Sequence, residues 1–211
     1  MSRTLYAAHY SCAGDPFQLT KAIKAADKED DLEGDGILLL QGGEDISPAM
    51  YGKPKNSYCH ASERPSFRDV KEMRLVNRAV KRGMPIVGIC RGAQMLCALD
   101  GGYLVQHIEG HSGIGNHILY DTRTGELLNT NSCHHQMMVP QKYNTILATD
   151  NSRTIRGYSE SDKQFTVDSV PEIVYFPRLN ALGIQGHPEW LPNSAFAHFC
   201  TNLIKEFLLK E

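Results

Sequence analysis

The sequence predicts an α/β domain whose central strands are buried on both faces. Short apolar runs alternate along the chain with longer amphipathic segments, which is the pattern of strands and covering helices in this class. Two runs, at residues 36–40 and 85–90, contain no charged position, which indicates fully buried strands. Because no internal repeat or low-complexity linker interrupts the 211 residues, we expect a single domain over residues 1–211.

The remaining elements follow from capping signals and periodicity. Residues 5–8 predict a first strand, and residues 16–26 a helix with Asp15 as N-cap and Pro16 at its first position. Residues 67–82 predict a second helix, with apolar residues at 67, 70, 73, 75/76 and 79/80 and an end at Gly83. A short helix is expected over 93–99, shorter strands and turns over 118–174, and an amphipathic helix covering the sheet over 194–209. The polar residues 59–68 are expected to form a loop, which either faces a substrate or only connects its neighbours.

Composition excludes several classes of protein. Hydrophobic residues make up 41% and charged residues 22% of the chain, and the net charge is −2, so we expect neither disorder nor binding of nucleic acid. The sequence has no apolar run near the ~18 residues of a membrane span and no apolar leader, so we expect no membrane segment. The six cysteines form no Cys-x-x-Cys pair, which favours individual thiols and a cytoplasmic location over a disulfide framework or zinc ribbon.

The most informative segment carries Cys90 at a junction between a strand and a helix. Gly88 and Gly92 lie two residues away on either side, so the chain can turn sharply and project the cysteine from the sheet. The helix N-terminus behind Cys90 favours the thiolate, and the Arg91 N–H is placed to bind an oxyanion. A buried structural cysteine is the alternative, which this setting disfavours.

A thiolate nucleophile needs a general acid, normally a histidine held by a third group. His187 follows an apolar segment, and in extended chain Glu189 points the same way and can hold the ring of His187. The tandem His134 and His135 are an alternative source of a base or of metal ligands. With Cys133 they cannot all share one strand face, so we expect a substrate-lining or core role and no metal site from these three alone.

Gly42 and Gly43 end the apolar run that begins at residue 36. Ligand sites in α/β sheets form at the carboxyl ends of strands, and two glycines there permit close backbone approach. We therefore expect the Gly43 N–H to be a second oxyanion donor, with a simple tight turn as the alternative.

Four motifs together resemble class I glutamine amidotransferase-like proteins, and most closely their gamma-glutamyl hydrolase branch. They are, in the order of that family, GGEDISPAMYG at 42–52, GICRGAQ at 88–94, NSCHHQ at 131–136 and GIQGHPEW at 183–190. The resemblance implies a flavodoxin-like three-layer α/β fold with a mostly parallel sheet and a nucleophile elbow.

The resemblance also implies a role for individual residues. Cys90 is then the nucleophile, His187 the general acid and base, and Glu189 the group that orients it. The backbone N–H groups of Gly43 and Arg91 form the oxyanion hole. Substrate-binding positions are Gln94, Ser132, His134 and His135.

The sequence departs from the family pattern at two positions near the site. Gly186 stands where a tryptophan usually precedes the catalytic histidine, which predicts a more open leaving-group side. Cys97 stands where the helix usually has an asparagine. The chain also has compressed segments before residue 36 and between residues 106 and 131.

The expected function is cleavage of a gamma-glutamyl amide bond, in glutamine or a gamma-glutamyl amine, through a glutamyl thioester, without a metal or organic cofactor. One alternative is a glutaminase subunit that delivers ammonia to a separate synthetase partner. Another is a non-catalytic binding relative, which the complete set of Cys90, His187 and Glu189 disfavours. The sequence does not decide whether the chain forms a homo-oligomer, which amine leaves, or to which pathway the reaction belongs.

Overall fold

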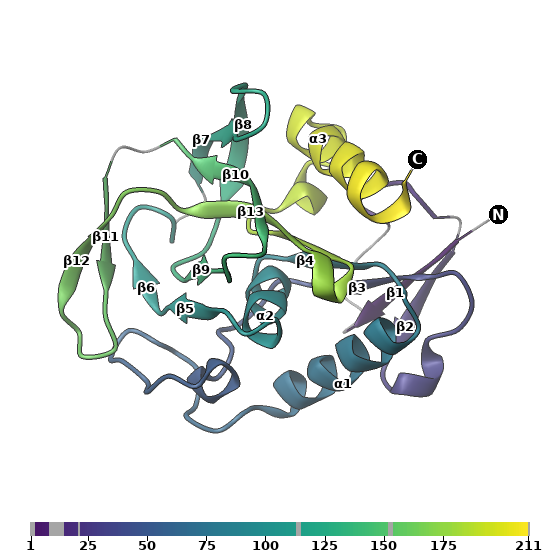
Figure 1. The fold of residues 1–211 in the computed structure, drawn as a ribbon, viewed down its shortest axis with the longest axis horizontal. Coiled ribbons are helices and arrows are strands. Elements are labelled where there is room, and N and C mark those ends of the chain that lie inside the picture. Colours follow the sequence, from purple (N-terminus) through teal and green to yellow (C-terminus); the bar gives the residue numbers. More distant parts are fainter. Residues whose placement is uncertain (1–2, 9–14, 21, 113–114, 152–153, 211) are drawn as a thin grey trace.

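The computed structural model describes residues 3–8, 15–20, 22–112, 115–151 and 154–210. Within these residues a nine-stranded sheet forms the centre of the molecule (Figure 1). In spatial order its strands are β2 (Ala22–Ala26), β1 (Thr4–Ala8), β3 (Ile37–Leu40), β4 (Ile86–Ile89), β14 (Ala181–Ile184), β13 (Pro171–Phe176), β10 (Thr145–Asp150), β7 (Gly115–Asp121) and β8 (Leu127–Ser132). The strands from β2 to β14 are mutually parallel, whereas those from β14 to β8 pair antiparallel.

Helices cover both faces of this sheet. The helices α1 (Phe67–Lys81) and α2 (Arg91–Leu99) lie on one face, and α3 (Ala195–Ile204), continued by a π-helical turn at Lys205–Leu209, lies on the other (Figure 1). Alternate residues of β3 supply the two cores: Leu38 and Leu40 join the α1 and α2 side, and Leu39 joins the α3 side. This arrangement confirms the expected α/β fold with flanking helices. Within the described residues, no helix is both long and apolar enough to cross a bilayer.

Smaller strands extend the molecule beside the antiparallel half of the sheet. They are β5 (Tyr103–Val105) paired with β9 (Met137–Val139), and β6 (His107–Ile108), β11 (Ile155–Tyr158) and β12 (Gln164–Val167) in a second small sheet. Short 3-10 turns occur at Glu29–Asp31, Pro48–Tyr51, Pro177–Leu179 and Pro188–Trp190. A separate apolar cluster that includes Val105, Ile108 and Val170 supports this region.

The helix predicted over residues 16–26 is wrong. Asp15 does cap a turn, since its carboxylate accepts hydrogen bonds from the backbone N–H groups of Phe17 at 2.9 Å and of Leu19 and Thr20 at 2.8 Å. The chain then forms β2 instead of a helix and pairs in parallel register with β1 at the edge of the sheet. Strand pairing has outweighed the helix propensity of this segment; residue 21 lies outside the described residues.

Candidate active site

Cys90 lies at a strained turn between β4 and α2. Its backbone has φ 49° and ψ −107°, a left-handed conformation that is costly for a residue with a side chain. A hydrogen bond of 2.7 Å from the Cys90 N–H to the Ile184 carbonyl holds the turn against β14. A Cβ on Gly88 would lie 2.5 Å from the Gly92 carbonyl carbon, and a Cβ on Gly92 would lie 2.4 Å from the Leu40 oxygen. The turn therefore requires both glycines, as the sequence predicts.

The three predicted catalytic segments follow adjacent parallel strands. Gly42, Cys90 and His187 lie beyond the carboxyl ends of β3, β4 and β14. A Cβ built on Gly42 would lie 3.0 Å from His187 Cε1 and 3.6 Å from Cys90 Cβ, so both side chains face the same glycine turn. The Cys90 Sγ also lies 3.9 Å from the Cys133 carbonyl oxygen.

His187 is held on several sides. Its Nδ1 lies 2.6 Å from Glu189 Oε1, and the Trp190 indole stacks on the ring with centroids 4.1 Å apart. The Asn131 side chain brackets the His187 backbone, donating to its carbonyl and accepting from its N–H at 2.7 Å each. Because Nδ1 is committed to Glu189, Nε2 is the ring nitrogen left for Cys90 and a substrate.

The surroundings of His187 favour the imidazolium. Burial opposes protonation of the ring, but hydrogen bonds with Cys90 and Glu189 outweigh it and raise the pKa of His187 to about 9. The ring of His187 is therefore protonated beside Cys90 at neutral pH, which suits proton donation to a leaving group.

Arg68, which sequence reasoning did not single out, clamps the glycine turn onto α1. Its Nη2 donates to the carbonyls of Gln41 and Gly42 at 3.0 Å each, and its Nη1 pairs with Glu44 at 3.1 Å. Gly43 has φ 151°, and a Cβ there would meet Arg68 Nη1 at 2.3 Å. The clamp thus fixes the peptide expected to donate to an oxyanion.

Arg91 anchors the other side of the expected oxyanion hole. Its buried guanidinium pairs with Asp69 at 2.5 Å and with Glu72, and both carboxylates are buried on α1. The buried stripe of α1 therefore runs through Asp69, Glu72, Leu75, Val76 and Ala79. The predicted apolar stripe through residue 67 is wrong at its start, because Phe67 is 86% exposed and the two carboxylates turn inward to meet Arg91.

Arg91→Met should destabilise the protein by about 3–5 kcal/mol, because it leaves the buried Asp69 carboxylate without its cation and Glu72 with Arg68 alone, which lies 2.8 Å away. Urea unfolding at neutral pH measures this change. The control is Arg156→Met, because the Arg156 side chain is 63% exposed and pairs with Glu109 at 3.5 Å. That variant should change stability by less than about 1 kcal/mol. Equal effects of the two substitutions would contradict an anchoring role for Arg91.

The predicted substrate-binding residues have distinct surroundings. Gln94 is buried on α2 and donates to Gln185 Oε1 at 3.3 Å. The Ser132 hydroxyl donates to the His111 carbonyl at 3.1 Å, and His134 Nδ1 pairs with the Gln136 carbonyl at 2.9 Å. Contact of these side chains with a substrate stays a prediction, since each already has a protein partner.

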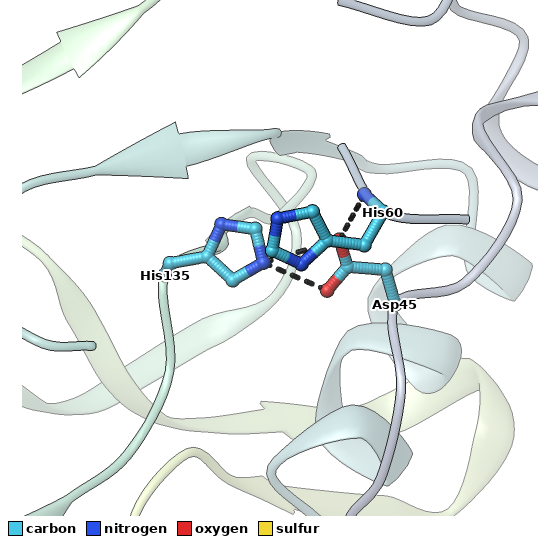
Figure 2. Close-up of side chains that lie close together, drawn as sticks. All are labelled: Asp45, His60 and His135. Carbon is cyan, nitrogen blue, oxygen red and sulfur yellow. Dashed lines mark hydrogen bonds and ion pairs between the residues drawn. The ribbon is translucent and has the colours of Figure 1, made fainter. Parts of the chain in front are cut away.

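His135 belongs to a partly exposed rim cluster with Asp45 and His60 (Figure 2). Its Nε2 lies 2.9 and 3.1 Å from the two Asp45 carboxylate oxygens, and the His60 backbone N–H donates to Asp45 at 2.8 Å. Burial raises the pKa of Asp45, but these hydrogen bonds outweigh it and leave the pKa lowered. The rim cluster therefore places a fixed carboxylate, that of Asp45, two residues beyond Gly43, with two histidines beside it.

The predicted opening at Gly186 is wrong. A Cβ at this position would lie 2.8 Å from Thr130 Oγ1, 2.9 Å from Phe196 Cζ and 3.0 Å from the Asn131 carbonyl oxygen. Gly186 therefore packs against β8 and α3 and leaves no free space for a leaving group. Cys97, the second departure from the family pattern, is a core residue. It is buried in the core between the sheet and the α1 and α2 helices, and its Sγ lies 3.7 Å from the Tyr103 carbonyl oxygen.

Comparison with known sequences assigns the family. The sequence profile of the peptidase C26 family matches residues 16–189, which is most of the chain. The chain belongs to the peptidase C26 family. A Mycobacterium tuberculosis protein provisionally named a glutamine amidotransferase is 34% identical over 170 residues, which cover 72% of this chain and 50% of that protein. The carbamoyl phosphate synthase small chain of Stutzerimonas stutzeri is 26% identical over 165 residues, or 76% of this chain and 33% of that protein.

This C26 chain thus spans half or less of the length of those two relatives. Among solved structures, PurLQS from Thermotoga maritima superposes with a TM-score of 0.61 and 18% identity, covering 100% of this chain and 99% of the other. That likeness shows a common fold. Together, the family and its relatives place the chain among glutamine amidotransferase-like proteins.

Proposed function

We propose that this C26 protein hydrolyses gamma-glutamyl amides, releasing glutamate and an amine. The observation that carries the proposal is the meeting of Cys90 and His187 at one glycine turn, with Glu189 holding His187 Nδ1 at 2.6 Å. In the first half-reaction the Cys90 thiolate attacks the amide carbonyl, forming a carbon–sulfur bond. The Gly43 and Arg91 N–H groups would stabilise the oxyanion.

The carbon–nitrogen bond then breaks, and His187 gives its proton to the departing amine. This leaves a glutamyl thioester on Cys90 and a neutral imidazole. In the second half-reaction His187 takes a proton from water, whose oxygen attacks the thioester. Cleavage of the carbon–sulfur bond releases glutamate and restores the thiolate and imidazolium.

Recognition of the glutamyl group is proposed for Gln94 and for the rim cluster around His135. The Asp45 carboxylate is fixed by hydrogen bonds next to the glycine turn, which suits an ammonium group. Gln94 lies one helical turn beyond Cys90, and its amide would bind a substrate carboxylate or carbonyl.

A glutaminase subunit is the second candidate, and two relatives favour it. The Stutzerimonas stutzeri relative is named as the small chain of carbamoyl phosphate synthase, and PurLQS from Thermotoga maritima has the same fold as this chain. Glutamate release by the isolated protein, measured with glutamine and a panel of gamma-glutamyl amines, separates the two functions. The hydrolase proposal predicts turnover of at least one amine conjugate without a partner. Turnover of glutamine alone, and only when a synthetase is added, would instead support the subunit.

The pKa of His187 predicts the alkaline limit of activity. Because its folded pKa of about 9 exceeds the ordinary 6.5, the imidazolium persists at neutral pH and is lost as the pH rises through about 9. Activity should fall over the same range, and so should the contribution of this ring to stability. In Glu189→Gln the alkaline limb of kcat/KM should move to lower pH, because an amide does not stabilise the cation. An unmoved limb would contradict the pairing.

A further inference from the structure

A second polar cluster lies buried beneath the site and takes no part in the proposed reaction. We call it the buried histidine cluster: His111, His117, His134, Asp150 and Glu172. Its members come from separate parts of the chain, including β7, β10, β13 and the segment between β8 and β9. Glu172 is 1% exposed and His111 and His134 are 3% and 4% exposed, so bulk water does not solvate their charges.

Three imidazole nitrogens of this cluster converge on one carboxylate oxygen. The Nε2 atoms of His134, His117 and His111 lie 3.3, 3.5 and 3.7 Å from Glu172 Oε1. His111 Nε2 also lies 3.0 Å from Asp150 Oδ2. None of the three Nε2 atoms, nor Glu172 Oε1, makes a hydrogen bond among the described residues.

The opposite ring nitrogens of two of these histidines already have backbone partners. His134 Nδ1 lies 2.9 Å from the Gln136 carbonyl, and His111 Nδ1 lies 3.3 Å from the Glu109 carbonyl. Carbonyls only accept, so Nδ1 carries the proton and, in the neutral ring, Nε2 presents a lone pair. Lone pairs aimed at a buried carboxylate repel it, and either a second ring proton or a metal ion removes this repulsion.

We propose that the buried histidine cluster binds a divalent transition metal, Zn²⁺ in the first place, through His111, His117 and Glu172, whose ligand atoms all lie within 4.8 Å of one another. Ligands about 2.1 Å from a tetrahedral ion are roughly 3.4 Å apart, close to the 3.5 and 3.7 Å that separate the Nε2 atoms of His117 and His111 from Glu172 Oε1. Two imidazoles with one carboxylate are a ligand set that suits Zn²⁺. The contact of His111 Nδ1 with the Glu109 carbonyl is an outer-shell partner of the kind that metal-bound histidines commonly have.

The rim cluster does not offer the same geometry. There His135 Nε2 and Asp45 lie at hydrogen-bonding distance, 2.9 and 3.1 Å, so the two groups satisfy each other. His60 is exposed and contributes its backbone N–H rather than its ring to Asp45. The buried cluster is therefore the better metal site.

A metal in the buried cluster would have a structural role that reaches the active site. The His134 N–H donates to the His111 carbonyl at 2.8 Å, so a metal on His111 would help to hold the segment that follows β8. The same segment contains Asn131, which brackets His187, and Cys133, whose carbonyl lies by Cys90.

Metal content and thermal stability test the proposal without reference to activity. The protein, freed of any affinity tag, is expressed with added Zn²⁺, dialysed against a mild chelator and analysed by elemental mass spectrometry. We expect about one Zn²⁺ per chain in the wild type, and a loss of about tenfold or more in His117→Gln and Glu172→Gln. His198→Gln, at an exposed position on α3, and His60→Gln, in the rim cluster, should both retain the metal.

If the cluster variants do not fold, measurements on the wild-type protein alone still test the proposal. Removal of the metal with a strong chelator should lower the Tm, and Zn²⁺ but not Mg²⁺ should restore it. Co²⁺ should bind the metal-free protein with the intense visible bands of a tetrahedral site and without thiolate charge-transfer bands. Absence of retained metal together with an unchanged Tm would overturn the proposal, leaving an ion-paired cluster. Loss of metal in His60→Gln but not in His117→Gln would overturn it in favour of the rim.

Discussion

Replacing Cys90 with alanine should abolish hydrolysis of gamma-glutamyl amides, because it removes the only atom proposed to bond to the substrate carbonyl. Serine at the same position should be almost as inactive, because its hydroxyl is far less ionised than a thiol at neutral pH. Alanine should also leave the fold intact or slightly more stable, since the strained turn is held by Gly88 and Gly92 and not by the thiol. Steady-state glutamate release and thermal unfolding measure the two effects.

Cys97→Ala is the matched control for Cys90→Ala. Cys97 lies on the same helix, and burial raises its pKa to about 12, so it is not a nucleophile at neutral pH. We expect this variant to keep its activity. Wild-type rates in Cys90→Ala, or complete loss in a folded Cys97→Ala, would refute the assignment of the nucleophile.

His187→Asn should lower kcat by about 10²–10⁴-fold, the usual contribution of a positioned general acid and base. Glu189→Gln should be less impaired, because it acts on the reaction only through the His187 ring. Both should retain their fold, and kcat measured at several pH values below 9 gives the comparison.

His198→Asn, at an exposed position on α3, controls for loss of a histidine far from Cys90. It should behave as wild type. If His187→Asn were as active as this control, the base would have to be sought at His134 or His135.

The strands around the nucleophile could be predicted because local and tertiary preferences agree there. Uninterrupted apolar runs belong to buried parallel strands, and both runs became the adjacent strands β3 and β4. The segment at 16–26 was predicted wrongly because its alanines and lysines favour a helix, whereas its partner β1 lies elsewhere in the sequence. Pairing at a sheet edge leaves only a weak signal in the paired segment itself.

For the site too, local patterns could be predicted, whereas contacts between segments distant in the sequence could not. Gly88 and Gly92 flank Cys90 in the sequence, so the glycines of the elbow could be identified from the local pattern. Arg68, Asp69 and Glu72 were missed because they look like the polar face of an amphipathic helix. The sequence signal, with hindsight, is a pair of carboxylates three residues apart, in phase with the buried Leu75 and Ala79.

Gly186 was misjudged and Asn131 was missed for a related reason. A glycine in place of a bulky residue suggests space, yet here the backbone of β8 and the ring of Phe196 fill it. The side chain of Asn131 brackets His187 from 56 residues away, a contact that only the folded sheet creates.

Trapping the acyl-enzyme tests the central claim most directly. The protein is mixed with glutamine or a gamma-glutamyl amide, quenched in acid within the first turnovers, digested and analysed by mass spectrometry. Acid preserves thioesters, so we predict a glutamyl adduct on the peptide that contains Cys90, increased in His187→Asn if hydrolysis of the thioester slows more than its formation. An adduct on Cys12, Cys59, Cys97, Cys133 or Cys200, or steady glutamate release from the Cys90→Ala variant, would contradict the account.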